Sequence, residues 1–195
     1  MIRAGFTIES PLTKSRTTVL ESDGETGGMG WLLEVHCPPK AGPDIAEHLH
    51  LSWTESFEIV SGTALYKLDG VQKTAQAGEK IVMPPGHPHI HPWNGGDTPL
   101  VYRQRDRFAQ ANPAAVQDVL GVFATVAGLA REGKVDSMGR PKNPLQLTAT
   151  LRTLSQYDGY DASLPIPAQK FLAATLGWLA NALGYRAVYP RYVEG

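Results

Sequence analysis

The sequence has only one cysteine, no marked excess of charge and no long hydrophobic run. The single cysteine, Cys37, excludes an internal disulfide framework, and we expect it to be a small buried apolar side chain. The formal net charge of −1 gives no electrostatic reason to expect nucleic acid or an anionic membrane as a partner. Residues 1–20 lack the continuous apolar core of a secretory signal. The apolar stretch at residues 171–184 is shorter than the ~20 residues of a membrane span. We therefore expect a cytoplasmic protein with no membrane span.

The 195 residues suit one domain, or one domain with an appendage. Residues 1–108 and residues 109–195 differ in the secondary structure that their residue patterns predict. Residues 1–108 contain short runs of β-forming residues, such as GWLLEVHC, SFEIVSG and PLVYRQRDRF, separated by turn signals rich in Gly, Asp and Asn. Many short strands at this spacing are typical of an antiparallel sandwich or barrel. We predict a mainly β fold, with a barrel over residues 1–108.

Residues 109–195 have a helical pattern instead. Asn112-Pro113 and Asn143-Pro144 each resemble an N-cap followed by proline at the first helical position. A third helix is predicted over residues 166–183, with a stripe formed by Leu172, Leu176, Leu179 and Leu183. These helices either pack on the barrel and on one another, or cap the barrel mouth or form a dimer face.

Histidine is the residue whose distribution is most informative. The chain has six histidines, and five of them lie between residues 48 and 91. In a strand, His48 and His50 share one face and present two imidazoles to a single point. Glu55 lies at an odd offset from His50, so a turn or bulge within residues 51–54 must reset the register for it to join them. The alternative is a pair of surface histidines. Glu58, the rival carboxylate, is expected on the opposite face.

A second stretch, GEKIVMPPGHPHIHPWN, runs from residue 78 to residue 94. Its strand ends in the rigid turn Pro84-Pro85-Gly86, and His89 follows where a neighbouring strand could aim it at the same point. In an extended segment, His91 lies on the same face as His89. His91 is then either a proton carrier near the site or a packed histidine between prolines, and His87 is expected to lie outside the site.

These two stretches resemble the paired motifs of the cupin superfamily. The first motif is matched by Gly42, five residues, His48-Leu-His50, four residues, Glu55, six residues and Gly62. The second is matched by Gly78, five residues, Pro84-Pro85-Gly86, two residues and His89, although Asn94 comes one position later than in the family. We expect the motif glycines to form turns rather than to contact ligands.

The resemblance implies a jelly-roll β-barrel, and the helical C-terminal part is then an extension outside it. It also implies one divalent metal ion, bound by His48, His50, Glu55 and His89, and a homodimer. Nitrogen and oxygen donors of this kind suit Fe, Mn, Co, Ni, Cu or Zn without discriminating among them. We predict a metal-dependent enzyme, dioxygenase-like, that acts on a small organic molecule. Isomerase, cyclase or lyase chemistry, and a non-catalytic role in binding or sensing, remain open alternatives.

Overall fold

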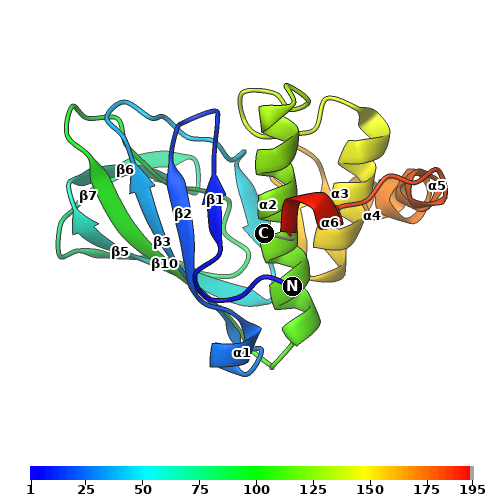
Figure 1. The fold of residues 1–195 in the computed structure, drawn as a ribbon, viewed down its shortest axis with the longest axis horizontal. Helices are drawn as coiled ribbons and strands as arrows, with labels where there is room; N and C mark the ends of the chain where they lie inside the picture. The colour runs from blue at the N-terminus through cyan, green and yellow to red at the C-terminus, as the bar shows by residue number, and fades with distance from the viewer. Residues whose placement is uncertain (194–195) are drawn as a thin grey trace.

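A computed structural model describes residues 1–193 and places two antiparallel sheets face to face, with helices along one side (Figure 1). The first sheet has the order β1 (Thr7–Glu9), β2 (Arg16–Glu21), β3 (Gly30–Cys37), β10 (Leu100–Phe108), β5 (Trp53–Ser61) and β8 (Lys80–Met83). The second has the order β11 (Gly159–Asp161), β4 (His48–His50), β9 (His89–Trp93), β6 (Thr63–Leu68) and β7 (Val71–Gln76). The predicted strand-rich cupin barrel with C-terminal helices is confirmed.

Strand β10 shows how the side-chain pattern builds the barrel. Its side chains alternate between buried and more exposed positions along all nine residues. The outer row contains Arg103, which pairs with Glu34 of the adjacent β3, and Arg105, which reaches across β3 to Glu21 of β2. This is the alternation expected of a strand with one face on the core and one toward solvent. The inner row of β10 therefore points between the two sheets.

The helices begin where the Asn-Pro pairs predict. Helix α2 (Pro113–Arg131) has Asn112 as its N-cap, whose Oδ1 accepts a hydrogen bond from the backbone N–H of Ala115 at 3.0 Å. Helix α3 (Pro144–Gln156) has Asn143 in the same role. The other helices are α1 (Asp23–Thr26), α4 (Ile166–Ala174), α5 (Leu176–Ala182) and α6 (Pro190–Val193).

Helix α2 joins the barrel and the helical part in one continuous core. Trp31 of β3 packs edge-on against Phe108 of β10 and Phe123 of α2, with ring centroids 5.6 Å and 6.3 Å apart. By length and composition alone α2 could span a membrane, with a mean hydropathy of 1.5. In the structure 61% of that stretch is buried inside the protein, so α2 has the character of a core helix.

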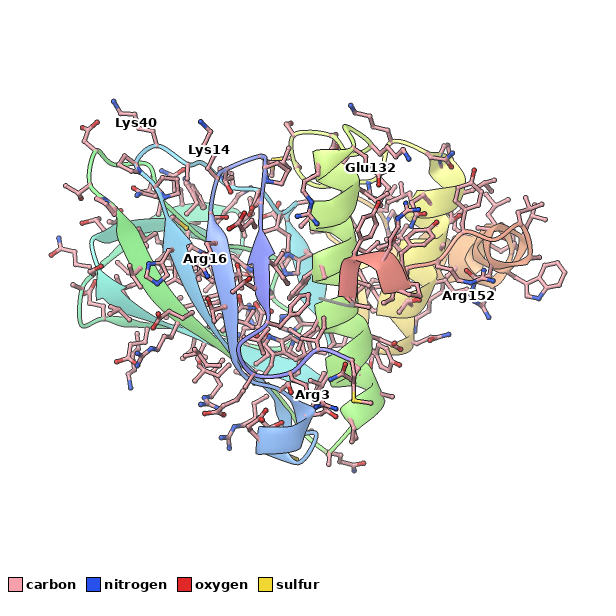
Figure 2. The ribbon with its side chains drawn as sticks, viewed as in Figure 1. Arg3, Lys14, Arg16, Lys40, Glu132 and Arg152 are labelled. Carbon is pink, nitrogen blue, oxygen red and sulfur yellow. The ribbon has the colours of Figure 1, made fainter. Side chains whose placement is uncertain are left out.

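The predicted single helix over residues 166–183 is wrong: this segment forms α4 and α5, which meet at Thr175. The leucine stripe is also not the buried face, since Leu176, Leu179 and Leu183 are exposed. Small residues are buried instead, namely Ala173, Gly177 and Ala180. They allow close packing on α3, because a Cβ on Gly177 would lie 2.9 Å from the Cβ of Arg152. Arg152, labelled in Figure 2, also donates to the carbonyl of Ala173 at 3.0 Å.

The helical part contributes one strand to the barrel. Strand β11, from the segment between α3 and α4, pairs antiparallel with β4, with Gly159 opposite His50 and Asp161 opposite His48. Two further backbone hydrogen bonds extend this contact, from Leu51 to Asp158 and from Ala162 to Glu47. The strand that carries the His-x-His motif therefore lies between β9 of the barrel and a strand from the C-terminal part.

Candidate metal centre

The first motif is divided between the two sheets. His48 and His50 lie on β4, and Trp53 and Glu55 lie on β5 of the facing sheet, with a bend at residues 51–52 between them. This bend is the register reset that the odd offset of Glu55 requires, and it turns the Glu55 side chain toward the histidines. Trp53 stacks on His50, with ring centroids 4.4 Å apart and an interplanar angle of 13°.

The second motif is fixed against the first by backbone contacts. His89 pairs in register with His48 across β4 and β9. The backbone N–H of Gly86, in the Pro-Pro-Gly turn, donates to the carbonyl of His50 at 2.8 Å. The four motif glycines all have positive φ, at positions 42 (67°), 62 (84°), 78 (89°) and 86 (83°), so their expected role in turns is confirmed.

Glu55 lies at the centre of a cluster of imidazoles. Its Oε2 is 3.1 Å from Nε2 of His89 and 3.0 Å from Nε2 of His91, and its Oε1 is 3.5 Å from Nε2 of His50. The ligand atoms of His48, Glu55, His89 and His91 all lie within 4.8 Å of one another. The structure therefore places three of the predicted ligands, His48, Glu55 and His89, in one group with His91, whereas His50 is not part of that group and its Nε2 approaches Glu55 only to 3.5 Å.

Three of the four imidazoles are oriented by backbone carbonyls. Nδ1 of His48 lies 2.9 Å from the carbonyl of Ala46, Nδ1 of His50 lies 2.8 Å from that of Trp53, and Nδ1 of His89 lies 2.8 Å from that of His87. A carbonyl only accepts, so each Nδ1 carries the proton, and in the neutral ring each Nε2 has a free lone pair. Metal-binding histidines are held in this way. Among the described residues, His91 has no such carbonyl partner, so its tautomer is free to change.

The donor atoms fit a divalent metal ion. Within residues 1–193, the Nε2 atoms of His50, His89 and His91 and Oε2 of Glu55 are buried without hydrogen-bond partners. Buried polar atoms are normally paired, so a cluster of unpaired lone pairs indicates a missing electrophile. Three neutral imidazoles and one carboxylate are ligands of the kind that bind divalent transition metals. The residues present therefore suit the metal that the resemblance implies.

The electrostatics favour the protonation states that a metal requires for His48 and Glu55, whereas at His89 the lowering effect of burial is outweighed by Glu55, which raises the pKa of that imidazole. Desolvation, with the neighbouring charges of His91 and His89, lowers the pKa of His48 well below its usual value. Burial would raise the pKa of Glu55, but His91 and the contacts with His50 and His89 lower it well below the usual value instead. At neutral pH, Glu55 is therefore a carboxylate and His48 a neutral imidazole, as metal ligands must be.

A second carboxyl group, which sequence reasoning missed, lies beside Glu55. Asp106 is buried on β10, directly opposite Glu55 in the register with β5, and Gln104 donates to its Oδ2 at 2.8 Å. Burial, and the charge of Glu55 beside it, raise the pKa of Asp106 well above its usual value. The sequence contains a signal for this inner row. Along β10 the even-numbered residues Tyr102, Gln104 and Asp106 alternate with arginines, so they lie on the opposite face of the strand from the arginines.

Three other residues that the motifs single out lie outside the cluster. Glu58 is exposed on the outer face of β5, as predicted. His87 is exposed and lies 2.9 Å from the carboxylate of Asp69. Asn94 is buried, and its Nδ2 donates to the backbone carbonyls of three residues, so the late-placed asparagine of the second motif closes a loop.

A cavity of about 270 Å³ leads from the cluster to the helices. His48, His50, Glu55 and His91 line its inner end. Its volume is slightly below the ~300–1,000 Å³ typical of small-molecule sites. The centre is therefore open to a small molecule on one side.

Residues 34–102 match the cupin domain family. Among solved structures, a predicted oxalate decarboxylase from Thermotoga maritima is 18% identical with a TM-score of 0.46, over 55% of this chain and 93% of that one. A conserved protein with a double-stranded β-helix domain from Klebsiella pneumoniae is 22% identical with a TM-score of 0.41, over 57% and 86% of the two chains. An RmlC-like cupin from Shewanella frigidimarina is 18% identical with a TM-score of 0.42, over 53% of this chain and 84% of that one.

No curated protein matches the chain. Through residues 34–102, with both motifs and the two-sheet barrel, the chain contains a cupin domain.

Proposed function

We propose that this protein is a metal-dependent enzyme that acts on a small organic molecule, with its ion held by His48, His50, Glu55 and His89. One observation carries the proposal: the Nε2 atoms of His50, His89 and His91 lie 3.0–3.5 Å from one buried carboxylate, and a ring nitrogen of His48 lies within 4.8 Å of it. A structural histidine gains nothing from leaving its second nitrogen unpaired in the interior, since an unpaired buried polar atom costs about 1–3 kcal/mol.

A bound ion, held by these four side chains, would supply Lewis-acid activation or oxygen chemistry beside the cavity. Glu55 is the one charge-bearing ligand, so the loaded centre has a net charge of +1. The neighbouring Asp106 does not change this charge while it keeps its proton. Among the reactions open to such a centre, we propose oxygen-dependent chemistry of the dioxygenase kind.

His91 has a separate role in this proposal. Its Nε2 lies 3.0 Å from Oε2 of Glu55 and borders the cavity, but its Nδ1 is not held by a carbonyl. A ring with an unfixed tautomer can take up a proton at one nitrogen and release it from the other. We assign His91 as the group that holds or moves a proton beside the metal.

Elemental analysis of protein purified without a metal-chelating tag tests the metal centre. We expect one transition-metal ion per chain, a sharp loss in His50→Ala and His89→Ala, and full retention in His87→Ala, the exposed control from the same turn. In His91→Ala we expect the metal to be retained. Full occupancy in His50→Ala would contradict the ligand set.

Oxygen uptake with the as-purified protein, measured over a panel of small organic acids and phenols, tests the reaction. Iron at full occupancy together with substrate-dependent O₂ consumption would support the dioxygenase assignment. Bound zinc or nickel, with an unchanged organic ligand recovered after denaturation, would contradict it and favour a binding protein instead.

A further inference from the structure

The cavity beside the metal centre is walled from two parts of the chain. On the barrel side it is lined by Trp31, Leu33 and Val35 of β3 and by Tyr102 of β10. On the helical side it is lined by residues of α2 and α3, among them Val119, Phe123, Ala127, Leu151 and Leu154. The C-terminal helices therefore build one wall of the chamber into which the metal ligands point.

The charged side chains that line the chamber fall into two sets. The histidines and Glu55 form the inner end. Near strand β11, Arg140 is bound to Asp161 by two hydrogen bonds of 2.7 Å and 3.2 Å, so its charge is already balanced. Asp44 accepts a hydrogen bond from Thr13 at 3.0 Å. Most of the remaining lining is apolar, although Thr17, Gln104 and Thr150 also border the cavity, so a ligand's body is expected to be largely apolar.

The charge of the loaded centre then selects the ligand's head group. A net charge of +1 in a chamber with apolar walls is poorly screened, so an anionic oxygen is favoured over a neutral one. The space corresponds to about nine water molecules at their share of liquid volume, ~30 Å³ each. A body of about ten non-hydrogen atoms fits this volume.

From these observations we infer that the chamber binds a compact apolar monoanion, such as an aromatic or alicyclic carboxylate, with its anionic oxygen at the metal and its apolar body against α2 and α3. This inference rests on the proposed metal centre. It gives the helical extension a direct part in ligand selection.

Equilibrium dialysis with protein loaded with one Zn²⁺ per chain tests the inference, with benzoate as the probe. We expect benzoate to bind at least tenfold more tightly than acetate, which has the charge but no apolar body. We also expect it to bind at least tenfold more tightly than benzamide, which has the body but no charge. Similar binding of benzoate and acetate, or of benzoate and benzamide, would overturn the inference even at full metal occupancy.

Two variants locate the bound probe. Ala127→Phe adds a ring to the helical wall and should weaken benzoate binding at least tenfold while one Zn²⁺ per chain is retained. Ala114→Phe places the same ring on the exposed part of α2 and should bind benzoate as the natural protein does. Unchanged benzoate binding in folded Ala127→Phe would show that the probe binds elsewhere. A chain that takes up no metal would overturn the proposed function and this inference together, whereas the results above overturn the inference alone.

Discussion

Asp106 and Glu55 lie side by side on adjacent strands, and both are buried. Two carboxyl groups in such contact cannot both be ionised without a large cost, and the three histidines around Glu55 decide which one keeps the charge. Glu55 is therefore ionised and Asp106 protonated, with the pKa of Asp106 raised well above its usual value by burial and by Glu55. Replacing Asp106 by Asn keeps the shape of the side chain and the oxygen that accepts from Gln104, but the amide does not titrate.

The size of the effect follows from one proton. In the unfolded chain Asp106 ionises near pH 3.9. Between that pH and its raised pKa in the fold, the native state binds one more proton than the unfolded state, so stability falls as pH rises. The slope is about 1.4 kcal/mol per pH unit, and it ends once the pH passes the folded pKa. Relative to Asp106→Asn, the natural protein should therefore lose unfolding free energy as the pH rises from 5, at up to about 1.4 kcal/mol per pH unit until the folded pKa is passed.

Urea denaturation of the metal-free protein, kept in chelator and followed by tryptophan fluorescence at pH 5, 5.5 and 6, measures this difference. The other titrating groups are common to both proteins, so the difference between the two curves isolates Asp106. Asp97→Asn, which removes an exposed carboxylate paired with Lys40, is the control and should follow the natural protein across this range. Parallel curves for the natural protein and Asp106→Asn would refute the assignment of the proton to Asp106.

Three further substitutions test other parts of the structure. Asn94→Ala should cost about 3 kcal/mol in urea denaturation, because the carbonyls of Cys37, Pro38 and Thr98 lose their donor, and an unchanged midpoint would contradict its loop-closing role. Asn112→Ala should lower the unfolding free energy by about 1 kcal/mol through loss of the α2 cap, and a neutral result would contradict the cap. Gly159→Val should weaken metal binding by about tenfold, measured by competition with a chelator. Its Cβ would lie 3.3 Å from Cη2 of Trp53, which stacks on His50, and unaltered affinity would contradict this coupling.

The part of the site that could be predicted is the part that local backbone geometry determines. The two motifs have fixed spacings between turns, so they specify where His48, His50, Glu55 and His89 fall on their strands. The odd offset of Glu55 requires a change of register, and the bend at residues 51–52 supplies it. The Asn-Pro starts of α2 and α3 are equally local, because a cap and a proline act within one turn.

The features that could not be predicted depend on tertiary contacts. Strand β11 has three residues in a helical region, and only its pairing with β4 makes it a strand. The buried face of α4 and α5 differs from the prediction. The leucine pattern predicts that large apolar residues are buried, whereas Gly177 and its small neighbours are the residues that pack against α3. Membership of His91 in the cluster was left open because its distance from Glu55 depends on how β9 of one sheet faces β5 of the other.

Strand β11 and the cavity wall lead to the same view of the C-terminal part. Residues 159–161 hydrogen-bond to the strand that carries His48 and His50, and the carboxylate of Asp161 holds Arg140 at the cavity. Helices α2 and α3 supply the wall that faces the imidazoles. A barrel without these residues would leave the edge of β4 unpaired and the chamber open to water on one side, where the +1 centre would be screened and would favour an anion far less. The boundary near residue 108 therefore separates two patterns in the sequence, but the ligand chamber needs both.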